Sequence, residues 1–540
     1  MAIGPTAQRF RFHLAFPHRP ISGVASPSVV LFLALFASQA GVLVMAPILS
    51  DVAAEFGVSI AEAGQLRILA APLAAVVAIA AGRALSRYSP RALIGAGSAQ
   101  FGFGTLGDIF SSNTLKGAHI ALVDINGEAL GKVLAAAKEF VEVHGLDFSL
   151  SAHTDRAEAL RGADFVIISI EVGSRFELWD QDWMIPLQYG IPQVYGENGG
   201  AGGLFHALRI VPPILEICRD CADLCPNATV FNFSNPMTAI VTTVARAFPK
   251  LKFVGLCHEI ASLERYLPPM LGLPFENLEL RAAGLNHFSV LVSARYRSTG
   301  ADAYPDILAR APAFFEKVLG YSDILEYIRT TGQIPRTEGE TGMPDIGRVT
   351  SSRAWSDRGL FRQILERFHL LPITSDSHIG EYIPWAREVA DHKGILDFYM
   401  LYRASLSMLK PAIELKVKER VVPIIEGLLS DAGYEEAAVN VMNAGLIPSL
   451  PGDVAVEVPA TVSARGLEGV AFPEYPKGFA ALLRNYTGVY DLTAEAVLRQ
   501  SEDLAIQALL VNPVVPVCAR VPELVDVMID RQAQWLGYLK

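Results

Sequence analysis

A short apolar strand that runs into a glycine turn, followed by a second apolar strand that ends in an acid, constrains this chain most. The turn covers residues 95–98, and the acid after the second strand is Asp124. Glycines in such a turn let the backbone approach a pyrophosphate, and the acid binds ribose hydroxyls. A glycine turn alone is often only a tight turn, but a helix over 130–143 and a strand over 164–170 favour a dinucleotide site. The predicted cofactor-binding residues are Gly95, Gly97, Ser98 and Asp124.

Two further turns carry amide side chains. Residues 195–203 form a glycine-dense turn before a predicted helix, which is either a flexible loop or a set of backbone N–H groups facing an anion or a sugar. The apolar strand 229–232 runs into an Asn-Pro turn, and strand ends form the ligand crevice of a doubly wound sheet. An Asn-Pro step can also simply start a turn. The predicted cofactor contact is Asn232, and the predicted substrate contacts are Asn198 and Asn235.

Two short apolar runs end in residues that bind transition metals. Cys257 follows the run 254–256, and His287 follows the run that starts at Gly284. If both runs are strands that finish at the same edge of a sheet, the two side chains meet on one ion. Each residue alone also fits a structural role, because a cysteine after a buried strand is usually a small core residue. Cys218 and Cys221 have metal-pair spacing too, but they lie in a predicted helix without a second such pair.

The first 90 residues differ from the rest of the chain. The run 29–49 carries no charge and matches the roughly 20 residues that span a bilayer, and a shorter uncharged run covers 68–82. Arginines flank both outer ends, so the positive-inside rule places these flanks in the cytoplasm. The segment, with its basic loop after the second run, resembles the first two helices of a major facilitator superfamily transporter, although Ser86 replaces the family's usual Asp.

Two helices cannot form a transport path, because such paths lie between whole helical repeats. Residues 1–90 are therefore interpreted as a membrane anchor, a fusion remnant or a gene-model error, and not as a working transporter. The catalytic part is expected in the cytoplasm, anchored to the membrane if this segment is an anchor. The formal net charge of −11 argues against a non-specific nucleic-acid binder, and five scattered cysteines do not form a disulfide framework.

The motifs downstream of the membrane-like segment resemble glycoside hydrolase family four, the NAD- and manganese-dependent glycosidases. In chain order they are Gly95-Ala-Gly-Ser98, Asp124, the Gly-Gly-Ala-Gly-Gly203 turn, Asn232-Phe-Ser-Asn235-Pro236, Gly-Leu-Cys257-His258, Gly-Leu-Asn-His287 and the segment 443–459. The resemblance runs from about Leu93 to the C-terminus. The cysteine and histidine in these contexts are specific to the family, whereas the glycine turn is shared with lactate and malate dehydrogenases.

The resemblance implies a glycosidase that is an exception to the two-carboxylate rule. In this family, bound NAD oxidises C3 of the sugar, a base removes the C2 proton, the C1 substituent is eliminated, water adds and the reduced cofactor restores C3. A divalent ion polarises the sugar oxygens. The resemblance implies that Cys257 and His287 hold manganese or another divalent metal, and it places His258 at the substrate.

The acid and the base are also carried over from the resemblance. The segment 179–187 resembles one with an acid shortly before Ile-Pro, which makes Asp182 the candidate general acid and Asp180 its rival. Asp345 has the spacing of the family's Asp-x-x-Arg element, which makes it the candidate base and Arg348 a substrate contact. The residues around Asp345 match the family poorly, whereas the segment 376–382 matches better and keeps Tyr382 and His378 as further catalytic candidates.

The expected fold is an α/β protein with a Rossmann-like NAD-binding domain and a helix-rich α+β catalytic domain, preceded by two hydrophobic helices. The domains are predicted at 1–90, 91–258 and 259–540, and helices are expected over 307–327, 360–368, 393–429 and 498–510 and from Glu523. By family resemblance we expect a homodimer or homotetramer that acts on a small glycoside. The alternatives are a sugar or hydroxy-acid dehydrogenase that releases NADH, and a non-enzymatic fragment of a membrane transporter. The motifs do not identify the sugar, its anomer or a 6-phosphate.

Overall fold

The computed structural model describes residues 90–95, 99–257, 259–333, 354–408, 412–417 and 419–539. The two hydrophobic helices expected within residues 1–90 lie outside these ranges. Within the described part, one helix is long and apolar enough to cross a membrane, Gly200–Leu224. Of its apolar window, 78% is buried inside the protein, which is typical of a core helix.

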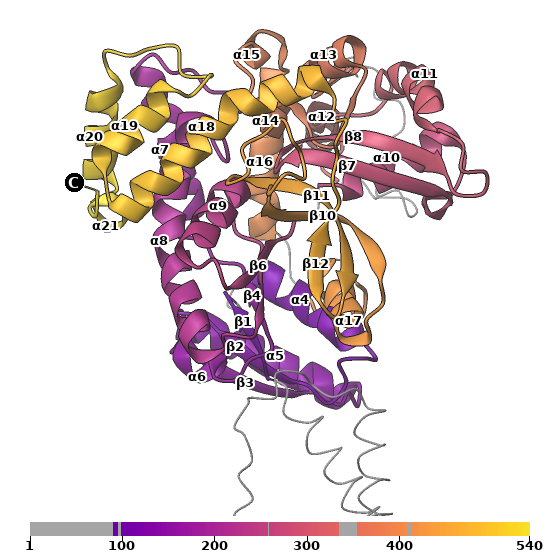
Figure 1. The fold of residues 1–540 in the computed structure, drawn as a ribbon, viewed down its shortest axis with the longest axis vertical. Coiled ribbons are helices and arrows are strands. Elements are labelled where there is room, and N and C mark those ends of the chain that lie inside the picture. The colour runs from indigo at the N-terminus through magenta and orange to yellow at the C-terminus, as the bar shows by residue number, and fades with distance from the viewer. Residues whose placement is uncertain are drawn as a thin grey trace, which may run out of the picture. The chain divides into compact units, whose positions relative to one another are not determined.

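Six parallel strands form the first half of the sheet, in the order β3-β2-β1-β4-β5-β6 (Figure 1). This is the strand order of a dinucleotide-binding fold, in which the order reverses between the first and fourth strands and leaves a crevice there. The strands are β1 Pro90–Ile94, β2 His119–Val123, β3 Ser149–His153, β4 Phe165–Ile168, β5 Thr229–Asn232 and β6 Lys252–Gly255.

Helices connect these strands and cover them with apolar faces. β2 and β4 are apolar and buried over almost their whole length, as expected for strands that are covered on both faces. The helices are α4 Ala99–Ser111, α5 Gly127–Val143, α6 Arg156–Leu160, α7 Arg175–Gln188, α8 Gly200–Leu224 and α9 Met237–Ala247. α8 is buried because it contacts α7 and α9 along its length and packs against the C-terminal helices α18 Lys477–Arg499 and α19 Glu502–Leu510.

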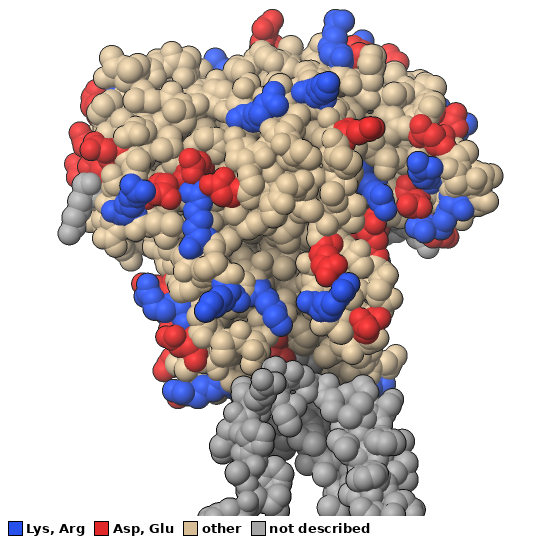
Figure 2. Space-filling view, viewed as in Figure 1, with Lys and Arg blue, Asp and Glu red and all other residues tan. Residues whose placement is uncertain are grey.

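The second half adds antiparallel strands and many helices. The strands are β7 Leu278–Leu285, β8 Phe288–Tyr296, β9 Leu371–Pro372, β10 Tyr434–Met442, β11 Ala455–Ser463 and β12 Gly466–Gly469. The helices are α10 Ala261–Leu271, the short 3-10 helix Phe275–Asn277, α11 Tyr304–Phe315, α12 Tyr321–Thr331, α13 Gly359–Phe368, α14 Asp376–Ile379, α15 Ala386–Val389, α16 His392–Met408, α17 Val421–Ser430, α20 Val521–Arg531 and α21 Ala533–Leu536, besides α18 and α19. Acidic and basic side chains are interspersed on the face seen in Figure 2.

The two halves form one sheet, because strands from late in the chain pair with β6. β10 lies beside β6 through the pair Asn440↔Gly255, and β11 lies beside β7 through the pair Glu457↔Gly284. β10 and β11 themselves pair over most of their length. Residues far apart in sequence are thereby brought next to the carboxyl end of β6.

Several expected helices are divided in the structure. The helix expected over 307–327 is two helices in the structure. α11 ends at Phe315, and α12 begins at Tyr321. Gly320 precedes α12, and its backbone N–H donates to the Asp323 carboxylate at 2.8 Å. The helix expected over 393–429 is also two, α16 and α17. The helix expected over 360–368 is confirmed as α13, and β3, β8, β9, β10 and β12 were not predicted.

Gly95 is the one residue of the predicted glycine turn that the structure describes. It ends β1 with φ +89°, and a Cβ built on it would lie 2.0 Å from the Ser169 carbonyl oxygen at the end of β4. The backbones of β1 and β4 therefore approach too closely at the crevice for any side chain at this position.

We expect Gly95→Ala to lower the free energy of unfolding by about 2–4 kcal/mol, through a strained backbone and overpacking against β4. Urea denaturation measures the change. Gly131→Ala is the matched control, since a Cβ there meets nothing within 4 Å in the middle of α5. It should raise stability by up to about 1 kcal/mol; equal effects of the two substitutions would contradict the steric argument.

Candidate active site

Two side chains with metal-binding atoms meet beyond the ends of β6 and β7. Cys257 follows β6, and His287 lies in the turn between β7 and β8, in the left-handed region with φ 61°. The Cys257 Sγ is 3.5 Å from the His287 Nε2. β7 runs antiparallel to β6 with β10 and β11 between them, so the pair does not come from two strands that end in the same direction. It forms across the junction of the two sheet halves.

The residue before His287 holds this turn in place. The Asn286 backbone N–H donates to the Thr238 hydroxyl at 3.2 Å, and its side-chain amide donates to a Glu457 oxygen at 2.7 Å. The Ser289 hydroxyl donates to the other Glu457 oxygen at 2.9 Å. Because Glu457 is buried on β11, the His287 ring is positioned by a strand from late in the chain.

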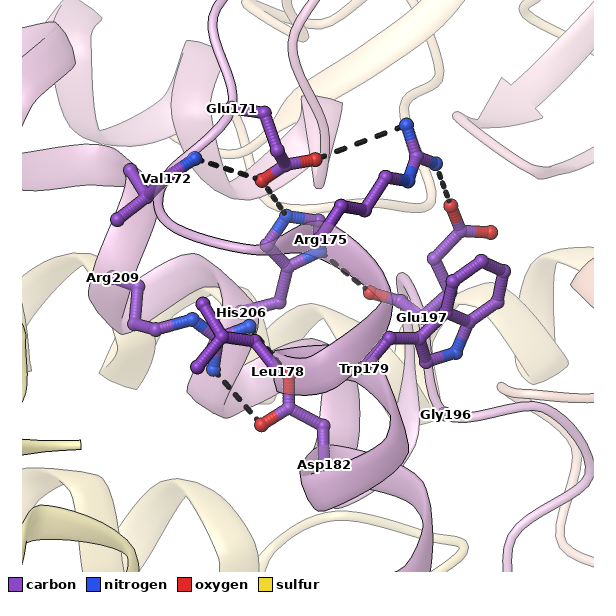
Figure 3. Close-up of a pocket in the computed structure, with 10 residues that line it drawn as sticks. All are labelled: Glu171, Val172, Arg175, Leu178, Trp179, Asp182, Gly196, Glu197, His206 and Arg209. Carbon is purple, nitrogen blue, oxygen red and sulfur yellow. Dashed lines mark hydrogen bonds and ion pairs between the residues drawn. The ribbon is translucent and has the colours of Figure 1, made fainter. Parts of the chain in front are cut away.

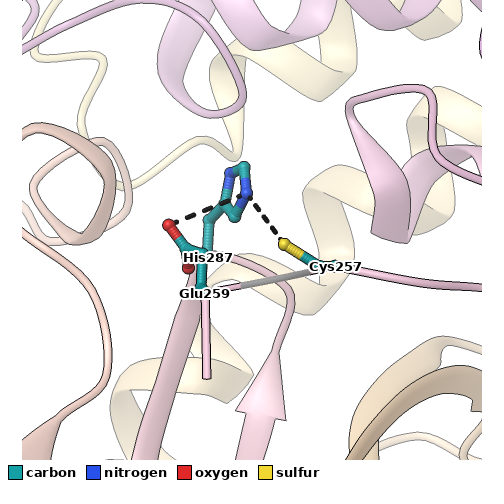
Figure 4. Close-up of side chains that lie close together, drawn as sticks. All are labelled: Cys257, Glu259 and His287. Atoms are coloured by element: carbon teal, nitrogen blue, oxygen red, sulfur yellow. Dashed lines mark hydrogen bonds and ion pairs between the residues drawn. The ribbon is translucent and has the colours of Figure 1, made fainter. Parts of the chain in front are cut away.

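A carboxylate joins this pair. The ligand atoms of Cys257, Glu259 and His287 all lie within 4.8 Å of one another, and Figure 4 shows the three side chains converging. The Glu259 Oε1 lies 3.8 Å from the His287 Nε2 and accepts a hydrogen bond from the Thr374 hydroxyl at 2.7 Å. Thiolate, imidazole and carboxylate together suit a divalent transition metal.

The electrostatics of this group also fit a cation. Burial, with the Glu259 and Glu457 carboxylates, raises the pKa of the Cys257 thiol well above its usual range. Burial likewise raises the pKa of Glu259, whose Oε2 is buried without a hydrogen-bond partner. Buried charges are costly unless they are paired or coordinate a metal. The residues present therefore fit a divalent metal ion.

His378 connects the metal-binding group to a second carboxylate. The residue lies in α14, and its ring centroid is 4.6 Å from that of His287. Its Nε2 lies 3.9 Å from Glu259 and its Nδ1 lies 3.8 Å from Glu197. His378, a secondary candidate in the sequence analysis, thus lies in the middle of the site.

Two backbone N–H groups at the start of the glycine-dense turn before α8 bond a carboxylate of the protein itself. The Glu381 carboxylate accepts hydrogen bonds from the backbone N–H groups of Glu197 and Asn198. Burial raises the pKa of Glu381 well above its usual range, and the nearby Glu197 acts in the same direction. At these two positions the N–H groups face an anion, and that anion is a side chain of the protein.

Two polar side chains in and beside this turn are buried without hydrogen-bond partners. They are the Tyr195 hydroxyl and both side-chain atoms of Asn198, which is 3% exposed. The Tyr195 ring packs edge-on against His378 with centroids 5.5 Å apart. Buried polar groups normally find partners, so these are ready to bond the hydroxyl groups of a ligand.

A cavity beside the turn is lined by a mixture of ionisable and apolar residues (Figure 3): Glu171, Val172, Arg175, Leu178, Trp179, Asp182, Gly196, Glu197, His206 and Arg209. Arg175 pairs with Glu197 at 2.5 Å and with Glu171 at 3.8 Å. Although burial opposes it, the nearby His206 and Arg175 lower the pKa of Glu171 to about 2. The Arg175 charge is thus already balanced by two carboxylates.

Asp182, the predicted general acid, is held in a buried ion pair. Its two oxygens accept from the Arg209 guanidinium at 2.8 and 2.5 Å, and one also accepts from Gln532 at 3.1 Å. Asp182 is 1% exposed. The arrangement is that of a buried ion pair between α7 and α8, in which the protein itself occupies both oxygens of Asp182.

Tyr382 is likewise not brought to the site. It is 1% exposed, stacks on Phe288 with ring centroids 5.0 Å apart and meets Tyr486 edge-on at 4.9 Å. Burial raises its pKa well above the usual range, which is the reverse of what a catalytic base needs. Its ring is a core residue between the β7–β8 hairpin and α18.

The predicted cofactor residues that the structure describes, Gly95, Asp124 and Asn232, lie at the carboxyl ends of β1, β2 and β5. Asp124 accepts a hydrogen bond from the Asn126 backbone N–H at 2.8 Å. The Asn232 amide is fully buried and donates to the Ser234 carbonyl at 2.9 Å, so it shapes the turn after β5. Asn235 precedes a cis proline in that turn and accepts from the Met237 backbone N–H at 3.2 Å.

Five predicted site residues lie outside the described ranges: Gly97, Ser98, His258, Asp345 and Arg348. Conversely, Glu197, Tyr195 and Glu259 lie at the site but were not predicted from the sequence. Glu259 had a usable signal, because a carboxylate two positions from a candidate ligand at a strand end is itself a candidate ligand. For Tyr195 and Glu197 the sequence contains no such signal, except that both residues lie next to the glycines of the turn.

The chain matches two family models and is similar in sequence to known glycosidases. The model described as Family 4 glycosyl hydrolase matches residues 92–273, and that of the Family 4 glycosyl hydrolase C-terminal domain matches residues 282–515. The chain is 61% identical to the Alpha-glucosidase of Erwinia rhapontici, over 83% of this chain and 99% of that protein. It is 26% identical to an Alpha-galactosidase of Bacillus subtilis (strain 168), over 78% of this chain and 92% of that protein.

Solved structures show the same fold. A 6-phospho-alpha-glucosidase from gut microorganisms, in complex with NAD and Mn2+, has a TM-score of 0.64 at 21% identity, over 83% of this chain and 99% of that chain. The 6-phospho-beta glucosidase of Thermotoga maritima, with manganese, NAD+ and glucose-6-phosphate, has a TM-score of 0.63 at 20% identity with the same coverage. At these identities the similarity establishes the fold.

The Asp182–Arg209 pair leads to a prediction about stability. We expect Asp182→Asn to destabilise the protein by about 3–5 kcal/mol, because it leaves the Arg209 charge buried and without its carboxylate partner. The folded fraction should keep most of its turnover. Chemical denaturation and specific activity per folded molecule measure the two effects.

Asp180→Asn is the matched control on the same helix. Asp180 pairs with Arg403 at 3.0 Å, and its side chain is 43% exposed. Its loss should cost less than about 1 kcal/mol. A large fall of turnover in Asp182→Asn without loss of stability would restore Asp182 as the acid.

Proposed function

Because the chain belongs to the family 4 glycosyl hydrolases, it is a glycosidase, and we propose that it hydrolyses unphosphorylated α-glucosides with NAD and a divalent metal ion. The observation that carries this proposal is the Cys257–His287 pair beside the carboxyl edge of a sheet with dinucleotide-binding strand order. The 61% identity to an Alpha-glucosidase supports the sugar. Family membership sets aside the dehydrogenase and transporter alternatives.

The charges around the site support a neutral sugar. Among the described residues, the charged groups that shift the pKa of Glu259 are Glu457 and Glu197, both acidic. Arg175 lies close by but is already paired with Glu171 and Glu197. A dianionic 6-phosphate would be repelled by these carboxylates, whereas sugar hydroxyls can donate hydrogen bonds to them.

In the proposed reaction the sugar is oxidised at C3, loses its C2 proton, eliminates its C1 substituent, adds water and is reduced again. NAD supplies the hydride acceptor and donor, and the divalent ion supplies polarisation of the sugar oxygens. Cys257 and His287 would hold the ion, while the turn at Gly95 and Asp124 would hold the dinucleotide. Tyr195 and Asn198 would donate hydrogen bonds to the sugar hydroxyls and accept hydrogen bonds from them.

The roles of five residues outside the described ranges rest on the sequence. On the pattern of the glycine turn, Gly97 and Ser98 stay our proposed cofactor contacts. On the family resemblance, Asp345 stays our proposed base, and Arg348 and His258 stay our proposed substrate contacts. We also propose a homodimer or homotetramer, on the family resemblance, and a division between cofactor and catalytic domains near residue 258.

The proposed reaction can be tested with a chromogenic glycoside. With NAD and manganese, nitrophenyl α-glucoside should release nitrophenol without net formation of NADH, and the 6-phosphorylated substrate should react at least about tenfold more slowly. A deuterium at C2 of the substrate should exchange with solvent during turnover. Mass spectrometry of the product measures the label, and its full retention would exclude the elimination route.

The second prediction concerns the metal. Cys257→Ser should abolish turnover, because it removes the thiolate, and EDTA should inactivate the wild-type enzyme until manganese is added back. Binding of NAD, measured by quenching of tryptophan fluorescence, should stay nearly unchanged in the variant. The buried Cys218 lies away from the site in α8, so Cys218→Ser is the control and should keep metal-dependent turnover. Full activity of Cys257→Ser would contradict the metal assignment.

A further inference from the structure

Glu259 lies where a third protein ligand of the metal would lie. Resting on the proposed function, we propose that Glu259 coordinates the divalent ion together with Cys257 and His287. The family resemblance provides the cysteine and the histidine, whereas Glu259 emerges from the tertiary structure. It follows Cys257 closely in sequence, beyond the end of β6.

The spacing of the three ligand atoms fits one ion. Donor atoms that lie about 2.0–2.3 Å from an ion, at angles near tetrahedral or right angles, are separated by roughly 3–4 Å. The Cys257 Sγ and the His287 Nε2 are 3.5 Å apart, and that Nε2 lies 3.8 Å from the Glu259 Oε1. All three donor atoms fall within 4.8 Å of one another. In Figure 4 they point toward one common point.

Among the residues that the structure describes, no arginine or lysine pairs with the Glu259 carboxylate. Its Oε1 accepts from the Thr374 hydroxyl, but its Oε2 is buried and has no hydrogen-bond partner. Its ion-pair neighbours are imidazoles, His287 at 3.8 Å and His378 at 3.9 Å, and these carry charge only when protonated. A buried carboxylate costs several kcal/mol unless a cation or several donors meet it. A divalent ion at this place would satisfy it.

Thr374 holds the carboxylate in position. Its hydroxyl donates to Glu259 at 2.7 Å, and it lies just before α14, which carries His378. Hydrogen bonds of this kind orient metal ligands from outside the coordination shell. A thiolate, an imidazole and a carboxylate would also suit a harder cation such as manganese better than a thiolate and an imidazole alone.

The experiment compares Glu259→Gln, Thr374→Val and Cys257→Ser with the wild type. Affinity for Mn2+ is measured by competition with a chelating indicator, and coordination is measured by the absorption of the protein loaded with Co2+. Glu259→Gln keeps the size of the side chain but removes the anionic ligand. It should weaken Mn2+ binding about a hundredfold or more and change the visible cobalt bands, while the thiolate-to-cobalt band in the near ultraviolet remains.

Thr374→Val is the matched control, because it removes the hydrogen bond to Glu259 and keeps the carboxylate. It should weaken Mn2+ binding by about tenfold, less than Glu259→Gln does, and keep the wild-type cobalt spectrum. NAD affinity and the unfolding midpoint are measured for each variant, so that a variant that does not fold is recognised and replaced by Glu259→Asp. The aspartate, which is shorter, should also shift the cobalt bands.

An unchanged cobalt spectrum and Mn2+ affinity in Glu259→Gln would overturn the proposal, even if turnover is lost, since Glu259 would then contact only the substrate. The two proposals fail in different ways. If Cys257→Ser loses the metal and Glu259→Gln does not, the third ligand alone is wrong. If both variants bind metal like the wild type, the proposed metal site itself is wrong.

Discussion

The site depends on one row of residues that crosses four strands. Gly255 on β6 pairs with Asn440 on β10, Asn440 with Glu457 on β11, and Glu457 with Gly284 on β7. β10 and β11 thereby join the parallel half of the sheet to the β7–β8 hairpin. Without this row, Cys257 and His287 would belong to two separate sheets. The metal-binding pair therefore exists only because strands from late in the chain lie between β6 and β7.

The row has a glycine at each end and polar side chains in its middle, and each kind of residue has a physical reason. A Cβ on Gly255 would lie 2.4 Å from the Met237 sulfur and 2.9 Å from the Asn440 Cβ, so glycine permits the close approach of β10. In the middle, the buried Glu457 accepts hydrogen bonds from Asn286, Ser289 and Asn440. Each of its oxygens is satisfied, and the bond to Asn286 positions His287.

Buried carboxylates around the site have separate tasks that their partners define. Glu457 and Glu381 accept hydrogen bonds from the protein and organise turns, and Asp182 neutralises Arg209. Glu259 has one oxygen, Oε2, without a partner, and its other oxygen, Oε1, lies 3.8 Å from the His287 Nε2. Counting carboxylates near the site thus does not identify a catalytic one. The partner of each oxygen decides whether the group holds the fold or is available to a ligand.

The sequence by itself determined the dinucleotide-binding half and the candidate metal pair. Strand ends, glycines and the terminal acid are local patterns, because they depend on the conformation of a few neighbouring residues. Gly95 and Asp124 accordingly lie where the pattern predicts, at the carboxyl edge of β1 and β2. Which groups meet at the site was decided by the tertiary structure, because hydrogen bonds between residues far apart in sequence leave no periodic signal. That is why Asp182 and Tyr382 turned out to be buried structural groups, while Glu259, Tyr195 and Glu197 came to lie around the metal-binding pair.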